Sequence, residues 1–253
     1  MAPVPEGMIK TRSIVLHRYP YSDSSWIVKA LTEECGIVSF IVKGGKRKES
    51  PFKGALDPLA LAEVVFKHNP NAELQFIKET SVLRWHENLR GDLLKLAKAQ
   101  VMAEMLLRYA PQGVPLEEEF ALMIDTLQQL DTPNAPENIF SRWLLSTSEA
   151  WGYHLDLGVC GRCGKELTEA AADFSPESGA FLCKECLGVA TPRAKTETLA
   201  GFWALYKGIP LQNAQYTENA LISYLKNHIG FLKEINSLQW LQETRKLCLP
   251  PKT

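Results

Sequence analysis

The stretch "GIVSFIVK" at residues 36–43 decides the fold of the first third of the chain. Its successive side chains alternate between two faces, with Val38, Phe40 and Val42 on one of them. A period of two residues is typical of a β-strand. Four similar segments lie on either side of it, namely "SIVLH" (13–17), "WIVKAL" (26–31), "LALAEVVFK" (59–67) and "ELQFIKE" (73–79).

Turn-rich segments of uneven length join these five predicted strands. Examples are "RYPYSDSS" after the first strand and "HNPNA" before the last. Asn, Asp, Ser and Pro favour turns because their side chains or fixed backbone angles stabilise chain reversal. Five short strands with uneven loops suit a small barrel better than a flat sheet with exposed edges. We therefore predict an OB-fold, a five-stranded Greek-key β-barrel.

The hydrophobic period changes from two residues to between three and four from Asp92 onward. In "DLLKLAKAQVMAEMLLRYA", Leu94, Val101 and Met105 fall on one helical face, and Asp92 is a suitable N-cap. The sequence therefore predicts an α-helical region after the barrel. Further helices are predicted at about 116–130, 137–151, 193–207, 217–229 and 236–246.

Four cysteines interrupt the helical region in "CGRCGKELTEAAADFSPESGAFLCKEC". Cys160 and Cys163 form one C-x-x-C pair, Cys183 and Cys186 form another, and nineteen residues separate the pairs. A two-residue gap aims two sulfurs at one tetrahedral ion, and this spacing is typical of zinc sites. Four thiolates leave no open coordination position, so we expect one structural Zn²⁺ ion. Nearby cations that can offset the thiolate charge are Arg162, Lys165 and Lys184.

Other interpretations of the cysteines fit less well. A thioredoxin-type redox site needs only one C-x-x-C pair on a strand–helix unit, and a disulfide scaffold suits a small secreted domain. A zinc deaminase needs a His-x-Glu motif, which none of the five histidines provides. Cys35 and Cys248 have no partner at metal-binding spacing, so both are expected to be buried apolar residues.

The predicted architecture is an α+β protein of several domains. At 253 residues the chain exceeds the roughly 100–200 residues of a typical single domain. The start "MAPVPEGMIKTRS" has no apolar signal-peptide core, and no apolar run approaches the roughly 18 residues that span a bilayer. The expected location is the cytoplasm. The expected domains are an OB-fold at 1–83, a helical domain at 84–157 and 191–253, and a four-cysteine zinc-finger module inserted at 158–190.

A strongly basic segment, "VKGGKRKESPFKGALDP" at 42–58, follows the third predicted strand, although the formal net charge of the chain is only −1. Barrels of this type often bind single-stranded nucleic acid, and cations can track its phosphate backbone and release counterions. Lys10 and Arg12 are expected to extend the same face. Taken alone, however, such a run is often a solvated loop. The cations of the segment are Lys43, Lys46, Arg47, Lys48 and Lys53.

Exposed aromatic rings near such a segment can stack on bases. Trp26, Phe40 and Phe76 are candidates, although packing in the barrel core is expected for most of them. No sequence motif indicates an enzyme, because the spacings of a P-loop, a G-x-S-x-G elbow, an H-E-x-x-H helix and a Rossmann fingerprint are all missing. A binding protein is therefore expected.

Several stretches together resemble the RecO family of bacterial DNA repair and recombination mediators. The N-terminal matches are the opening strand from Met8, the "YSD" at 21–23, the "LT..CG" at 31–36, and the "KG..R" loop that runs into "KGALDP". Later matches are "WGYHLDLGVCGRCG", "ADFSPESGAFLC" and "LISYLKNHIG". The resemblance covers nearly the whole chain, with residues 1–7 as an extra leader. Not every RecO keeps the four cysteines, whereas this chain has all of them.

The resemblance implies a nucleoid-associated protein without catalytic turnover. Such proteins bind single- and double-stranded DNA, anneal complementary strands, and help to load RecA onto strands coated with single-strand-binding protein. The implied partners are RecR and the acidic C-terminal tail of single-strand-binding protein, which would need an apolar pocket rimmed by Arg or Lys in the helical part. The alternative is a zinc-containing protein-interaction scaffold with incidental DNA affinity.

Overall fold

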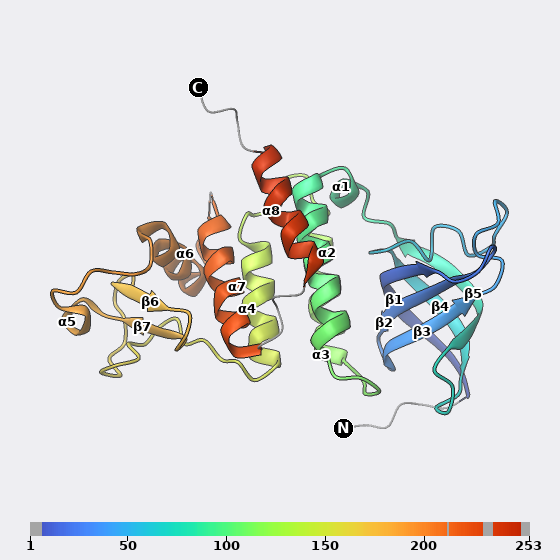
Figure 1. Ribbon diagram of the computed structural model, residues 1–253, viewed down its shortest axis with the longest axis horizontal. Helices are drawn as coiled ribbons and strands as arrows, with labels where there is room; N and C mark the ends of the chain where they lie inside the picture. Colours follow the sequence, from blue (N-terminus) through green and yellow to red (C-terminus); the bar gives the residue numbers. More distant parts are fainter. Residues whose placement is uncertain (1–6, 212, 230–234, 249–253) are drawn as a thin grey trace. The chain divides into compact units, whose positions relative to one another are not determined.

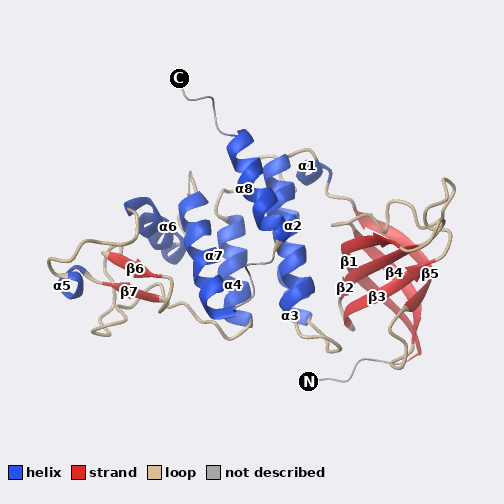
Figure 2. Cartoon of the chain, viewed as in Figure 1, coloured by secondary structure: helices blue, strands red, loops and turns tan. Residues whose placement is uncertain are grey.

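The computed structural model describes residues 7–211, 213–229 and 235–248, and it divides into two compact units. The first unit comprises Met1–Pro133 with Ile235–Thr253, and the second comprises Asn134–Glu234. Figure 2 shows that strands dominate the N-terminal part and helices most of the remainder, as the α+β prediction requires. Residues 1–6 of the expected leader lie outside the described residues, whereas Gly7 already belongs to the first strand.

Five strands of the first unit form a closed barrel in the order β1-β2-β3-β5-β4 (Figure 1). Strand β1 closes it by pairing with β4 as well as with β2, and only the β3–β5 pair is parallel among the described barrel strands. This topology confirms the predicted five-stranded OB-type barrel. The bounds are β1 Gly7–Pro20, β2 Trp26–Thr32, β3 Gly36–Val42, β4 Leu61–His68 and β5 Gln75–Arg84.

Two strands are longer than the sequence predicted. Strand β1 begins six residues before the predicted start at Ser13, because residues 7–14 pair in register with β4. Strand β5 continues to Arg84 and pairs with β4 over most of its length. Its exposed residues carry no clear two-residue alternation, so only the long-range pairing with β4 defines where the strand ends.

The barrel core contains the inward face of each strand. Val38, Phe40 and Val42 of β3 are buried, as the alternation predicted. Phe40 meets Phe66 of β4 edge to face, with ring centroids 5.0 Å apart. This geometry is favourable for aromatic quadrupoles and adds to the free energy gained from burial.

Helices α1, α2, α3 and α8 belong to the first unit, and α8 packs on α2 (Figure 1). Asp92 is the predicted N-cap of α2, and its carboxylate accepts hydrogen bonds from the N–H groups of Leu94 (2.9 Å) and Lys95 (3.1 Å). The bounds are α1 Glu87–Arg90, α2 Leu93–Tyr109, α3 Glu117–Leu130 and α8 Asn236–Cys248.

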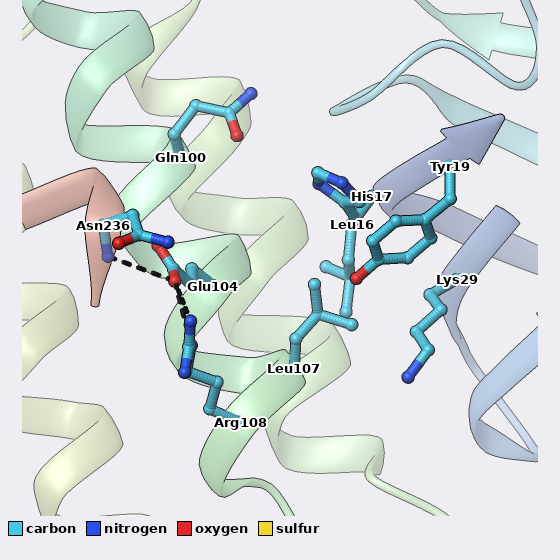
Figure 3. Close-up of a pocket in the computed structure, with 9 residues that line it drawn as sticks. All are labelled: Leu16, His17, Tyr19, Lys29, Gln100, Glu104, Leu107, Arg108 and Asn236. Carbon is cyan, nitrogen blue, oxygen red and sulfur yellow. Dashed lines mark hydrogen bonds and ion pairs between the residues drawn. The ribbon is translucent and has the colours of Figure 1, made fainter. Parts of the chain in front are cut away.

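Glu104 of α2 fixes the start of α8. Its carboxylate accepts hydrogen bonds from the backbone N–H groups of Asn236 (3.2 Å) and Ser237 (2.8 Å), and it forms an ion pair with Arg108 at 2.8 Å. Figure 3 shows the contacts of Glu104 with Asn236 and Arg108. The first N–H groups of a helix have no partner inside the helix, so this carboxylate serves as their cap. Burial raises the pKa of Glu104, but these donors outweigh it and hold the pKa below its ordinary value.

The second unit packs α7 against α4 and α6 and carries the small β6–β7 hairpin. The rings of Phe174, Phe181 and Phe202 form its aromatic core, with centroid distances between 4.6 and 5.0 Å. The hairpin lies between the two cysteine pairs in the sequence, and Phe174 and Phe181 face each other across its two strands. The bounds are α4 Ile139–Ala150, β6 Asp173–Ser175, β7 Ala180–Leu182, α5 Lys184–Leu187, α6 Thr196–Lys207 and α7 Gln215–Ile229.

The two remaining cysteines differ in their surroundings. Cys35 is buried, as expected, and burial raises the pKa of its thiol to about 11. Cys248 is exposed at the end of α8, so the expectation of a buried residue was wrong there. By helical spacing it lies on the same face as the buried Leu241, Thr244 and Arg245, but it is the last residue of the helix and remains exposed there. Among the described helices, none has the length and apolar character needed to cross a bilayer.

We expect Gly36→Ala to destabilise the first unit strongly. Gly36 has a φ of +65°, and a Cβ there would lie 1.9 Å from the carbonyl oxygen of Val114. The left-handed backbone costs about 1–2 kcal/mol for alanine, and the backbone clash adds to it. Urea unfolding should therefore show a loss above about 2 kcal/mol. The control is Gly113→Ala, where φ is +73° but no atom lies within 4 Å; equal losses in the two variants would contradict the clash.

We expect Glu104→Gln to lower the free energy of unfolding by about 1.5–3 kcal/mol at neutral pH, because charged hydrogen bonds are lost. The folded-state pKa of Glu104 is depressed, so its contribution is present above the unfolded-state value of about 4.3 and disappears as the pH falls further. Urea unfolding at pH 7, 5 and 3.5 should therefore show a smaller acid-induced loss in the variant. Glu118→Gln, at an exposed position of α3, is the matched control and should keep the wild-type pH dependence.

Candidate functional site: a basic loop and a four-cysteine cluster

The basic loop, residues 43–60 between β3 and β4, is held against the β1–β2 turn. The backbone N–H of Lys46 donates to the carbonyl of Ser24 at 3.0 Å, and its ammonium donates to the carbonyl of Ser22. At the other end of the loop, Arg18 of β1 forms a 2.6 Å ion pair with Asp57. These contacts give the loop a fixed course on the barrel.

Trp26 is the centre of this attachment. The Arg18 guanidinium lies 4.4 Å from the ring centroid of Trp26, and the Lys46 ammonium lies 5.0 Å from it. Gly45 permits the close approach, because a Cβ there would lie 2.9 Å from Cδ1 of Trp26. Cation–π contacts near the surface contribute about 0.5–1 kcal/mol each, so the contact of Lys46 with Trp26 adds to the hydrogen bonds that hold the loop.

Most cations of the loop have no acidic partner. Within the described ranges, no ion pair joins Lys43, Arg47, Lys48 or Lys53 to a carboxylate. Lys43, Arg47 and Lys48 also line a shallow cavity of about 450 Å³ with residues 49–52. Unpaired cations on a fixed loop produce a local positive potential that attracts phosphate groups.

Lys10 and Arg12 lie elsewhere on the barrel. Both are in the first half of β1, which pairs with β4, whereas the loop meets the second half at Arg18. Lys10 forms a 2.9 Å ion pair with Glu63, and Arg12 forms a two-pronged pair with Glu33 that raises the pKa of the guanidinium. The structure therefore does not bring these two residues together with the loop, and their DNA contact stays a prediction.

The three aromatic candidates have different surroundings. Phe40 is fully buried in the barrel core, and Trp26 is half-buried between its two cations. Phe76 has 55% of its surface exposed, and the ammonium of Lys43 lies 5.3 Å from its ring centroid. Of the three, Phe76 is therefore the ring that a ligand can reach.

The four cysteines converge in the second unit. Their sulfur atoms all lie within 4.8 Å of one another, and those of Cys163 and Cys183 are 3.9 Å apart. Cys160 and Cys163 come from a tight turn in which Gly164 N–H donates to the Cys160 carbonyl, and Cys183 and Cys186 come from the β7–α5 junction. An all-sulfur group of this kind can hold one metal ion.

The electrostatics of the cluster favour a cation at its centre. Burial raises the pKa of Cys160, but backbone N–H groups of Cys163, Cys183 and Arg162 donate to the sulfur and lower the pKa to about 6. The thiol of Cys186 donates to its neighbour Cys163, which raises the pKa of Cys186 to about 12. Cys186 thus keeps its proton, because a second thiolate beside that of Cys160 would be repelled. A bound cation would remove this repulsion and displace the proton.

The three cations expected to offset the cluster are themselves engaged. Lys165 pairs with Glu185 at 2.8 Å, and Lys184 pairs with Glu169 at 2.8 Å. Arg162 donates through Nη1 to the carbonyl of Cys186 at 2.5 Å. Arg162 therefore ties the first cysteine turn to the second, and the two lysines balance nearby glutamates.

Two further cavities escaped the sequence analysis, because each combines residues distant in the chain. In the first unit, a cleft of about 480 Å³ lies between the outer face of β1–β2 and α2 (Figure 3). Glu104, on its α2 side, is already saturated by donors and is a poor general base. In the second unit, a cavity of about 430 Å³ has Phe174 and Ala220 in its wall and Arg193 and Lys195 as its cations.

Comparison with known proteins identifies the family. The family model described as "Recombination protein O N terminal" matches residues 7–86, and "Recombination protein O C terminal" matches residues 90–239. The DNA repair protein RecO of Anaeromyxobacter sp. (strain Fw109-5) is 29% identical over 91% of this chain and 97% of its own length. That of Roseiflexus sp. (strain RS-1) is 26% identical over 96% and 88%. The first model covers the barrel with its basic loop and the second covers the cysteine cluster, and the chain therefore belongs to the RecO family of DNA repair proteins.

Proposed function

We propose that the protein is a non-catalytic DNA-binding mediator of recombinational repair in the cytoplasm. It binds single- and double-stranded DNA without sequence preference and anneals complementary strands. Together with RecR it assists the loading of RecA onto DNA coated with single-strand-binding protein. The main support is the basic loop, which carries five cations without an acidic partner in the described part of the chain and has a fixed course on an OB-type barrel.

The mechanism follows from charge and from the lack of base readout. Loop cations neutralise phosphates and release condensed counterions, so the affinity is electrostatic and independent of sequence. Bases of a strand held by its backbone remain available for pairing. A second strand approaches with less repulsion, because part of the phosphate charge of the first is already neutralised. No bond is formed or broken in this process.

The proposed protein partners are RecR and the acidic C-terminal tail of single-strand-binding protein. Such a tail requires apolar contact together with cations. The 430 Å³ cavity of the second unit has this character, because Arg193 and Lys195 lie beside Phe174, Pro176 and Ala220. The Lys195 ammonium is 4.9 Å from the ring centroid of Tyr216, which also lines the cavity.

We further propose that the cysteine cluster binds one structural Zn²⁺ ion through Cys160, Cys163, Cys183 and Cys186. Zn–S bonds of about 2.3 Å in a tetrahedron place the sulfurs about 3.8 Å apart. The 3.9 Å between Cys163 and Cys183, and the 4.8 Å limit for the whole group, agree with this geometry. The metal would stabilise a module whose hairpin has only three residues in each strand.

We expect a variant with four loop cations changed to glutamine to bind single-stranded DNA more weakly and with a flatter salt dependence. The slope of log K against log salt should fall by up to about 0.7 for each lost phosphate contact. The same variant should anneal complementary strands coated with single-strand-binding protein more slowly, in an assay without nucleotide. The positions are Lys43, Lys46, Arg47 and Lys48.

A control variant removes the same number of charges from helices and should keep the wild-type slope. An unchanged slope in the loop variant would reject the loop as the main contact. If the wild type neither binds nor anneals DNA but still captures partner proteins, the scaffold alternative is correct. The control positions are Lys95, Lys207, Lys226 and Lys246.

We expect the purified protein to contain one zinc ion per chain, and Cys160→Ser or Cys183→Ser to lower this content and destabilise the second unit. Metal analysis measures the stoichiometry, and cobalt substitution reports thiolate ligation through its charge-transfer absorption. The control is Cys248→Ser, since this exposed thiol lies outside the cluster. Full zinc occupancy in the Cys160 and Cys183 variants would show that the ligand assignment is wrong.

A further inference from the structure

Strand β5 has an unusually exposed course for a barrel strand (Figure 1). It pairs with β4 along most of its length, but with β3 only through Gln75 and Phe76. From Lys78 to Arg84 its second edge has no strand partner in the described part of the chain, and nearly all of its side chains are exposed. Such an edge normally attracts another strand.

Several features protect this edge against pairing with another protein strand. The β4–β5 ladder shifts register twice, between Leu61 and Ala62 and between Val65 and Phe66. Bulges of this kind twist an edge away from a flat partner. Lys78 and Arg84 add exposed charges, which oppose strand addition. A protein strand is therefore not the expected partner of this edge, and its exposed aromatic rings suit a ligand that is not a β-strand.

Two exposed rings stand at the two ends of this edge, each with a cation over it. Phe76 is 55% exposed, and Lys43 Nζ lies 5.3 Å from its centroid. Trp85, directly after β5, is 42% exposed, and the guanidinium of Arg90 lies 4.7 Å from its centroid. Arg90 is itself fixed, because it donates to the carbonyls of Trp85 (2.7 Å) and Pro58 (2.5 Å).

The basic loop accompanies β5 from one ring to the other. Its start, Lys43, lies over Phe76. Its middle, Gly54, is beside Val82, since a Cβ on Gly54 would be 3.7 Å from Cγ2 of Val82. Near its end, the carbonyl of Pro58 accepts a hydrogen bond from Arg90, whose guanidinium lies over the ring of Trp85. The loop therefore lies beside β5 at three points between the two rings, and we call Phe76, Trp85 and the loop cations together the β5 track.

We propose that the β5 track selects single-stranded DNA by stacking unpaired bases on Phe76 and Trp85, while the loop cations hold the phosphates. This proposal rests on the proposed DNA binding and adds a strand preference to it. The two rings are nine positions apart along the chain, about 30 Å at roughly 3.3 Å per residue, which suits the roughly 4–16 nucleotides that one OB-fold binds. Cations over the rings favour a polyanion over a peptide.

The same geometry makes the protein bind the single-stranded substrate of annealing more tightly than the duplex product. Bases in a duplex are stacked on one another and paired, so they cannot lie on Phe76 or Trp85. When a complementary strand pairs with the bound one, its bases leave the rings and the stacking energy is lost. The duplex then keeps only the phosphate contacts, so the product binds more weakly than the substrate.

The test compares three ligands of equal length and charge per strand: a single-stranded oligonucleotide, an abasic sugar-phosphate strand, and a duplex. The variant Phe76→Leu with Trp85→Leu keeps apolar side chains but removes both π faces. We expect its affinity for the single strand to fall by about 5- to 150-fold per ring, with the salt slope unchanged. Affinity for the abasic strand and the duplex should change by less than about twofold. Fluorescence anisotropy measures all three.

Conservative variants separate stacking from folding. Phe76→Tyr and Trp85→Phe retain aromatic faces and should keep single-strand affinity, whereas Leu83→Ala, at another exposed apolar position of β5, should have no effect. If wild type binds single strands and the double variant binds them equally well, the track is wrong and the basic loop remains the site. If wild type binds no DNA at all, the proposed function itself fails.

Discussion

The double pairing of β1 is the constraint on which the rest of the first unit depends. Residues 7–14 pair with β4 and residues 13–20 pair with β2, so Ser13 and Ile14 pair with both strands. The β1–β2 ladder also has an irregularity between Val15 and His17. Because β1 closes the barrel, β3 and β5 need to share only two residue pairs. The consequence is an exposed β5 edge with the basic loop beside it, which a fully paired sheet would not allow.

The local charge of this surface depends on which cations are paired with carboxylates, and the net charge of the chain does not reveal it. The formal net charge is −1, and cations such as Lys10, Arg12 and Lys165 are each matched with a glutamate. The loop instead gathers Lys43, Arg47, Lys48 and Lys53 within eleven residues, and none of them has an ion pair with a carboxylate in the described part of the chain. A nearly neutral protein can in this way present a local surface that attracts phosphate groups.

Two small clusters lie around the hairpin of the second unit, apart from the helical core in which α7 packs on α4 and α6. The rings of Phe174, Phe181 and Phe202 form the first, and the four sulfur atoms form the second. The two are adjacent in the chain, since Phe181 lies two residues before Cys183 and its carbonyl accepts from Gly161 N–H at 2.8 Å. A short hairpin has little apolar surface to bury, so convergent thiols are a physically reasonable supplement.

The sequence by itself determined the features that depend on local spacing. Alternation revealed the buried face of β3, a three-to-four period and Asp92 revealed α2, and the C-x-x-C pairs indicated one metal cluster. Tertiary structure decided what depends on distant partners. Phe40 and Phe76 both lie on predicted strands, yet barrel closure buries the first and leaves the second exposed. Lys10 and Arg12 lie in the part of β1 that pairs with β4, and each forms an ion pair there and not with the loop. The sequence does not reveal this, because strand register is set by contacts between residues remote in sequence.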